Sequence, residues 1–204
     1  MSTIDILPKI KFIMLEPARF FSQLKKETGV KAAFLYFLVV SLCSAVLGLA
    51  VTFLFKNYSY NLMYNLVSKI TGSAIPLPQQ TTNELLAWSI VGYALGLGLS
   101  FIFAGMLHGW ILLFGGKETY SKTYQLSIYS STPALVLGWI PFVGFFTWIY
   151  DLILLIIGTQ KVHKISPLKS ILMYVIPLVL FIILIVGTLF LLFFIAQQLP
   201  VLMS

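Results

Sequence analysis

The chain has 204 residues, of which 59% are hydrophobic and only 9% charged, and its mean hydropathy is +0.98. A soluble globular chain carries roughly 25% charged residues, and a chain of this length could not bury so much apolar surface in water. The composition excludes a soluble protein and predicts an all-α integral membrane protein. The net charge of +7 is interpreted as a topology signal, so we expect no nucleic-acid partner.

Residues 1–32 are predicted to form a cytoplasmic amphipathic segment that lies at the membrane interface. Ile6, Ile10 and Ile13 recur at helical spacing, and Pro17 suits the first turn of a second helix. The second helix carries a predicted lipid-binding surface with an apolar and a basic side: Arg19, Phe20, Phe21, Lys25 and Lys26. Such helices lie in the headgroup plane and favour anionic lipids. The alternative is an ordinary positive flank before the first span.

Residues 33–204 are predicted to form a membrane domain of five transmembrane helices. The spans are expected at about 33–55, 85–114, 122–139, 142–158 and 170–196. Pro133 removes a backbone donor from the third span and should kink it, and a tight turn at 139–141 leads into the fourth. The fourth span is only about 17 residues long, so a deep V that stops short of the outer interface is an alternative to two full crossings.

The distribution of basic residues predicts the orientation of the five spans. Eleven Lys and Arg residues fall on the side of the N-terminus and two on the other side; the eleven are Lys9, Lys11, Arg19, Lys25, Lys26, Lys31, Lys117, Lys122, Lys161, Lys164 and Lys169. Positively charged loops stay on the cytoplasmic side. We therefore expect a cytoplasmic N-terminus and a C-terminus on the outer side.

The second span is rich in glycine and is predicted to be the central packing helix. Gly92 with Gly96, and Gly105 with Gly109, have the spacing of small residues that lets helix backbones approach closely in lipid. This pattern predicts helix packing and needs no ligand.

Asp151 stands inside the fourth span, where an ionisable group costs about 3 kcal/mol or more unless it has a partner. Helix rise places Asp151, His108 and Tyr129 about 12, 10 and 12 Å from the inner ends of their spans. We therefore predict a buried contact between His108 and Asp151, with Tyr129 and Ser130 or Ser127 beside them. This polar cluster is either a clasp that orients helices or a binding site in a proton- or ion-linked cavity.

No metal site, cofactor or enzymatic activity is expected. The two histidines lack dense ligand spacing, because His163 is placed in the loop after the fourth span rather than near His108. Cys43 is the one cysteine, which excludes an intrachain disulfide. Neither a nucleophile motif nor a phosphate-binding glycine pattern is present.

Several short motifs, in order, give the chain a resemblance to a known family. They are Pro17-x-x-Phe20-Phe21 with Gly29; His108 with Gly115-Gly116; Tyr129-Ser130-Ser131-Thr132-Pro133; Pro141, Gly144, Tyr150 and Gly158; and His163-x-x-Ser166. With these motifs the chain resembles the Ypt/Rab-interacting-protein (Yip) domain family, in its prokaryotic branch. The resemblance implies five spans, a cytosolic N-terminus and a prokaryotic plasma membrane.

Eukaryotic members of that family bind prenylated Rab-type GTPases and shape membranes of the early secretory pathway. The first segment of this chain is short and offers little surface for a GTPase, so we do not expect GTPase binding. The leading expectation is a non-enzymatic membrane scaffold or adaptor, whose partners are membrane lipids and a second copy or another membrane protein. The alternative is a small transporter or channel built around His108 and Asp151.

Overall fold

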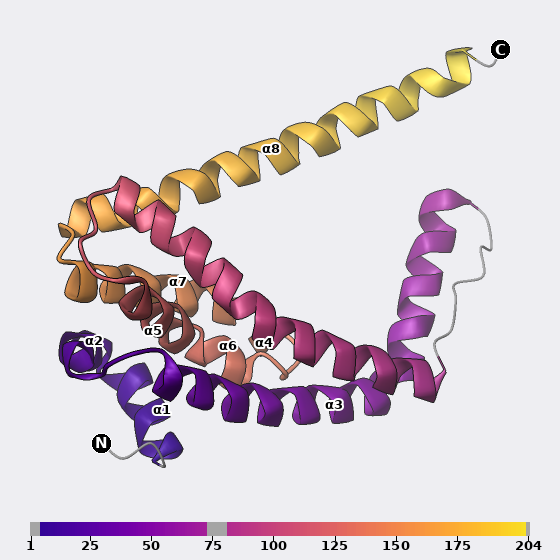
Figure 1. The fold of residues 1–204 in the computed structure, drawn as a ribbon. Helices are drawn as coiled ribbons and strands as arrows, with labels where there is room; N and C mark the ends of the chain where they lie inside the picture. The colour runs from indigo at the N-terminus through magenta and orange to yellow at the C-terminus, as the bar shows by residue number, and fades with distance from the viewer. Residues whose placement is uncertain (1–4, 73–80, 203–204) are drawn as a thin grey trace.

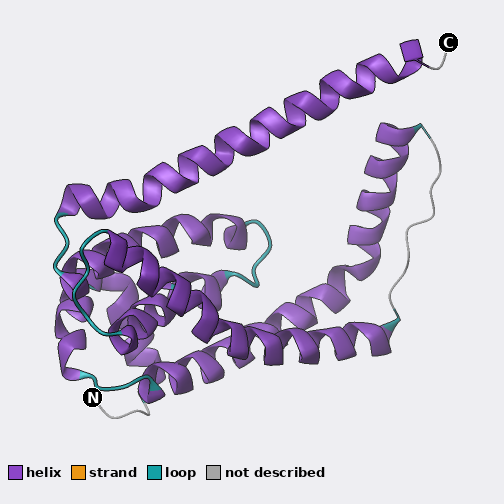
Figure 2. Cartoon of the chain, turned by 45° about the horizontal axis from the view of Figure 1, so that its top comes forward, coloured by secondary structure: helices purple, strands orange, loops and turns teal. Residues whose placement is uncertain are grey.

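The computed structural model describes residues 5–72 and 81–202, and all regular elements within them are helices (Figure 2). In chain order they are α1 (Ile6–Leu15), α2 (Pro17–Gln23), the 3-10 helix η1 (Leu24–Lys26), α3 (Lys31–Thr71), α4 (Thr82–Leu113), α5 (Tyr120–Ser130), α6 (Thr132–Leu137), α7 (Val143–His163) and α8 (Pro167–Leu202). The predicted all-α class is confirmed for these residues.

Four helical stretches are long and apolar enough to cross a membrane, and they match four of the five predicted spans. They are Lys31–Lys56, Thr82–Leu113, Val143–His163 and Pro167–Ile195. The third predicted span, 122–139, is instead divided between α5 and α6. Pro133 has no N–H with which to continue α5, so the backbone breaks at Ser131 and a new helix begins at Thr132.

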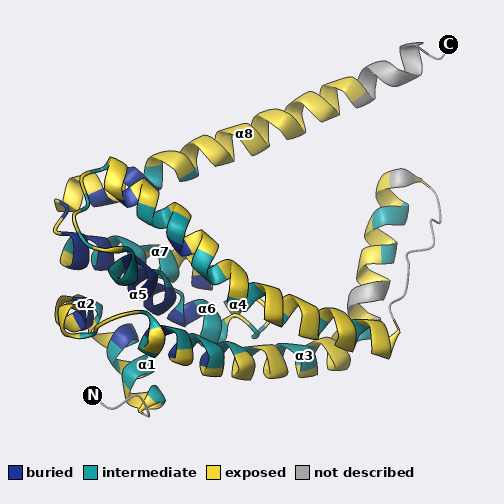
Figure 3. Cartoon of the chain, in the orientation of Figure 1, coloured by how far each residue is buried: buried dark blue, intermediate teal, exposed yellow. Residues whose placement is uncertain are grey.

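The long helices radiate from a compact region that we call the base. Figure 1 shows α3 and α4 running close together away from the base, while α8 leaves it in a different direction. Figure 3 shows the buried residues concentrated on α5 and the elements around it, whereas most of α8 is exposed. The base therefore holds the protein core, and the far parts of the long helices present apolar side chains outward, as lipid requires.

The centre of the base is α5, not the glycine-rich helix α4 that the sequence indicated. Seven of the eleven residues of α5 are buried. Among the described residues, no atom lies within 4 Å of a Cβ added at Gly92, Gly96 or Gly109, and only Gly105 comes near a neighbour, the Tyr120 ring at 3.9 Å. Among the described residues, Gly92, Gly96 and Gly109 thus show no close approach of another helix, and helix packing through the two glycine pairs stays a prediction.

The N-terminal helices α1 and α2 pack on protein along their apolar sides. Phe20 and Phe21 are 5% and 0% exposed, and the Phe20 ring makes an edge contact with the Tyr129 ring of α5 at 5.2 Å. These two aromatic residues therefore lie inside the core instead of at the predicted lipid-facing side. Arg19, Lys25 and Lys26 are exposed, and lipid binding through them stays a prediction.

Gly158 of α7 is where three elements approach one another most closely. A Cβ added there would collide with the Leu126 side chain of α5 and lie 3.1 Å from the Phe21 ring of α2. Leu126 and Phe21 are both fully buried, so neither has free space into which to move. The absence of a side chain at Gly158 is therefore what lets α2 and α5 meet on α7.

Substitution of this glycine should destabilise the base. Gly158→Leu is expected to lower the free energy of unfolding by about 1–3 kcal/mol or more, because it overfills a packed core. The matched control is Gly187→Leu on α8, where no atom lies within 4 Å of an added Cβ. Thermal unfolding in detergent measures both variants, and equal stabilities would contradict the packing described here.

Candidate functional site

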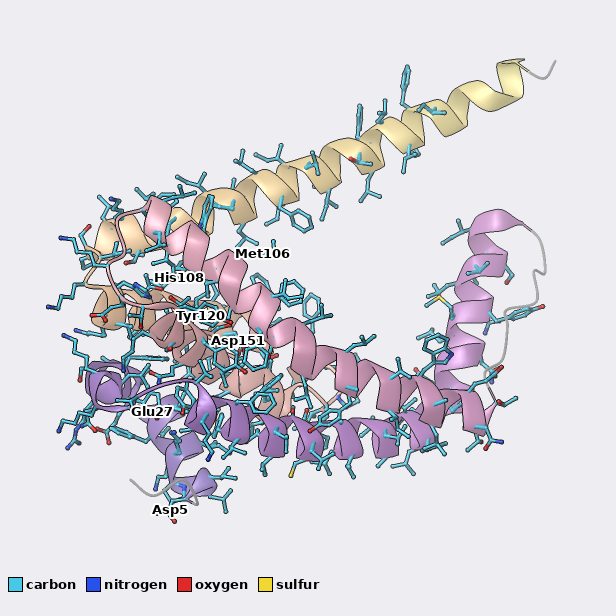
Figure 4. All side chains as sticks on the ribbon, in the orientation of Figure 1. Asp5, Glu27, Met106, His108, Tyr120 and Asp151 are labelled. Atoms are coloured by element: carbon cyan, nitrogen blue, oxygen red, sulfur yellow. The ribbon has the colours of Figure 1, made fainter. Side chains whose placement is uncertain are left out.

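Among the residues that the structure describes, three clusters of polar side chains around α5 contain the predicted site residues. Figure 4 shows Glu27, His108 and Asp151, one from each cluster, at different places in the bundle. One cluster ties the N-terminal segment to α5, the second joins two histidines, and the third surrounds the carboxylate of α7. In a low-dielectric environment each buried polar group needs a partner, so the partners define what each cluster does.

The first cluster is centred on the Tyr129 hydroxyl. This hydroxyl donates to Glu27 Oε1 at 2.7 Å and accepts from the Lys9 ammonium at 2.6 Å. Lys9 also pairs with Glu27 Oε2 at 3.2 Å and lies 4.3 Å from the centre of the Tyr129 ring. The Lys9 and Glu27 side chains are only 17% and 22% exposed, so this is a largely desolvated ion pair completed by a hydrogen bond.

Two further residues of α5 hold the backbone between η1 and α3. Lys122 donates from its ammonium to the carbonyl oxygens of Leu24, at 2.7 Å, and of Glu27. Gln125 donates from its amide to the carbonyl of Gly29 at 2.5 Å. Gly29 has a φ of +66°, a left-handed conformation that suits glycine. The segment 24–29 is therefore fixed to α5 through its backbone as well as through Glu27.

The second cluster joins His108 of α4 to His163 of α7 through Thr123 of α5. The Thr123 hydroxyl lies 2.8 Å from His108 Nδ1 and 3.1 Å from His163 Nε2. His163 therefore ends α7 beside the His108 region, which corrects its predicted place in a distant loop. Its Nδ1 is buried without a hydrogen-bond partner among the described residues. This connection can orient helices, as expected for the predicted polar cluster, but it joins His108 to Thr123 and His163 instead of to Asp151.

The third cluster contains Asp151, whose carboxylate accepts a backbone N–H at the break between α5 and α6. Asp151 Oδ1 accepts the backbone N–H of Ala134 at 3.1 Å. This N–H belongs to the first turn of α6, where no carbonyl of the same helix is available to accept it. Asp151 thus pairs with a backbone group that the helix break at Pro133 leaves without a partner in α6. Its side chain also lines a cavity together with Ser127, Ser130 and Ser131.

The predicted contact between His108 and Asp151 is not present in the part of the chain that the structure describes. Their hydrogen-bond partners are Thr123 and Ala134 respectively. The reason is the length of α7, which continues to His163 rather than ending near residue 158. Asp151 lies about 18 Å from that inner end and His108 about 8 Å from the end of α4. The structure does bring Ser130 and Asp151 to one cavity, while Tyr129 belongs to the first cluster.

Sequence reasoning missed Lys9, Glu27 and Thr123 as members of these clusters. One signal was present: Lys122, Thr123 and Gln125 are polar residues at the start of a predicted span, where unpaired side chains would be costly. Nothing in the sequence pairs them with their partners. In the described residues, no group of three or more His, Cys, Asp or Glu side chains is arranged to hold a metal ion.

Comparison with known proteins gives one family. The model of the Yip1 domain matches residues 11–189, a range that includes residues of all three clusters. Searches of the curated proteins and of the solved structures give no significant match.

Breaking the first cluster should release the N-terminal segment. Glu27→Gln leaves the Lys9 ammonium without its buried counter-charge, and we expect a loss of about 1–3 kcal/mol in unfolding free energy. Trypsin should then cut faster after Lys25 and Lys26. The control is Glu16→Gln, whose ion pair with Arg19 is exposed and contributes at most about 1 kcal/mol. Equal effects of the two substitutions on stability and proteolysis would contradict the role of this cluster.

Proposed function

The chain belongs to the Yip1 domain family, and from this premise we propose that it is a non-enzymatic membrane scaffold or adaptor of the Yip type. Its apolar helices make it a membrane protein. The finer assignments, to the prokaryotic branch and to a plasma membrane, rest on the sequence motifs alone. A GTPase partner is not part of the proposal, since the apolar side of residues 6–29 is used for packing on the base.

One observation carries this proposal: the N-terminal segment is fixed on the core with four of its basic residues exposed. Phe20, Phe21 and the Glu27 cluster secure its inner side, while Lys11, Arg19, Lys25 and Lys26 are exposed. We call these four residues the basic platform. A rigid positive surface beside the spans suits anionic lipid headgroups, which attract each nearby Lys or Arg by about 1 kcal/mol.

We propose five crossings, with α5 and α6 together as a broken third one. The 21-residue helix α7 is long enough to cross, and a turn over residues 138–142 joins it to α6. With the basic platform on the cytoplasmic side, the charge asymmetry then gives a cytoplasmic N-terminus and an outer C-terminus. The alternative is a re-entrant hairpin. It would also leave the N-terminus cytoplasmic and the C-terminus outside, but its turn would stay within the membrane.

The turn itself distinguishes these two topologies. Phe142 is 87% exposed at its tip, so Phe142→Cys in a Cys43→Ser background gives one labelling position. We expect an impermeant maleimide to label it from outside in intact cells. Lys117→Cys in the same background should react only after the membrane is opened. Protection of the Phe142 position from both sides would establish the re-entrant hairpin instead.

Reconstitution in vesicles tests the scaffold proposal. The wild-type protein should gather anionic lipid, self-associate as measured by energy transfer between labelled copies, and reduce vesicle diameter in electron micrographs. The enrichment of anionic lipid should weaken in high salt, because salt screens the attraction between exposed charges beyond a few Å. An Arg19→Gln, Lys25→Gln, Lys26→Gln variant should bind anionic lipid more weakly by about 5-fold for each charge removed, at about 1 kcal/mol per charge.

The matched control changes charge on the other side of the protein. Lys69→Gln removes a basic residue from the end of α3 and should leave the lipid enrichment in the cytoplasmic leaflet unchanged. If the wild-type protein shows no self-association, no lipid enrichment and no change of vesicle shape, the scaffold proposal is wrong.

A further inference from the structure

A cavity of about 340 Å³ lies between α4, α5, α7 and the first turns of α8. Its size falls within the range of small-molecule sites in proteins. The lining residues are Leu107, Ser127, Ser130, Ser131, Trp148, Asp151, Leu152, Leu155, Tyr174 and Leu178. Figure 1 shows α8 diverging from the other helices beyond the base, so the cavity lies near the point where the bundle opens.

One wall of the cavity offers hydrogen-bond acceptors that the protein leaves unused. Asp151 Oδ1 takes the N–H of Ala134, and the described residues provide no hydrogen bond to its second carboxylate oxygen. Ser130 is only 3% exposed, and its hydroxyl has no partner among the described residues. A buried polar group without a partner costs about 1–3 kcal/mol. A ligand that donates hydrogen bonds here would remove this cost.

The other walls and the charge balance define the rest of the ligand. Leu107, Leu152, Leu155 and Leu178 form apolar walls, and Trp148 adds an aromatic face. Among the described residues that line the cavity, Asp151 is the one charged side chain and none is basic. We propose that the cavity binds a lipophilic amine, with its ammonium group on Asp151 and Ser130 and its hydrocarbon part against the leucines.

The depth of Asp151 favours a single-chain amine over an aminophospholipid. Asp151 lies about 12 Å from the outer end of α7 and about 18 Å from the inner end, within the hydrocarbon region. A phospholipid would bring its phosphate to that depth, where no lining residue could neutralise it. A fatty alcohol would meet the hydrogen-bonding need but not the charge. The proposal goes beyond the scaffold function and does not depend on it.

Trp148 lets the binding be measured on the full chain in nanodiscs. A bromoalkyl primary amine should quench tryptophan fluorescence saturably, and Trp148→Phe should remove the saturable component. Asp151→Asn should weaken amine binding by about 10-fold to 100-fold, as expected for the loss of a hydrogen bond to a charged group. Ser130→Ala should weaken it by about 3-fold to 10-fold. A brominated alcohol and a brominated phosphatidylethanolamine are the comparison ligands.

Two further variants keep the test decisive. Leu178→Trp places a larger side chain of α8 in the cavity. It should abolish saturable amine binding although Asp151 is unchanged. Thr188→Ala, whose hydroxyl bonds within α8 away from the cavity, should bind as the wild type does. The proposal is overturned if Asp151→Asn has wild-type thermal stability and binds the amine unchanged, or if Leu178→Trp still binds the amine. It is also overturned if the alcohol binds as tightly as the amine, or if brominated phosphatidylethanolamine quenches Trp148 saturably.

Discussion

The structure depends on the burial of a polar helix at its centre. Helix α5 carries Thr123, Gln125 and Tyr129 as buried side chains, and buried polar groups that water cannot reach need partners within the protein. Their partners must come from other elements of the chain. Gln125 and Tyr129 recruit the N-terminal segment, and Thr123 recruits a histidine from each of α4 and α7. The contacts that satisfy α5 are therefore the same contacts that assemble the base.

This constraint gives residues 5–30 a structural role in the base. An amphipathic helix that lay freely on a membrane would place its apolar side in lipid, but here that side completes the core around Tyr129 and Gly158. The segment is thus part of the fold, and its basic residues are held in place by it. Because the described residues place the predicted His108–Asp151 pair in two different clusters, the transport alternative would have to rest on the cavity beside Asp151.

Features local in sequence could be predicted, and features that join distant residues could not. Apolar runs predicted four of the spans, and Pro133 predicted the irregularity that separates α5 from α6. Lys9 and Tyr129 are 120 positions apart, and no periodicity relates them. The His108–Asp151 prediction assumed that the fourth span ends near residue 158. Helix α7 continues to His163, so Asp151 lies farther from the inner end of its helix than the prediction assumed.

Helix α8 is attached to the base near its N-terminal end. It is held by Tyr174, bonded to Thr159 at 2.8 Å, and by the Met173 carbonyl, which accepts the Trp110 indole N–H at 3.1 Å. Its candidate span of 29 residues is about 44 Å long, against roughly 30 Å of hydrocarbon. Tilt about this anchor is one way for a bilayer to accommodate the excess length. With tilt as the response, the angle between α8 and α4 would change with the thickness of the membrane.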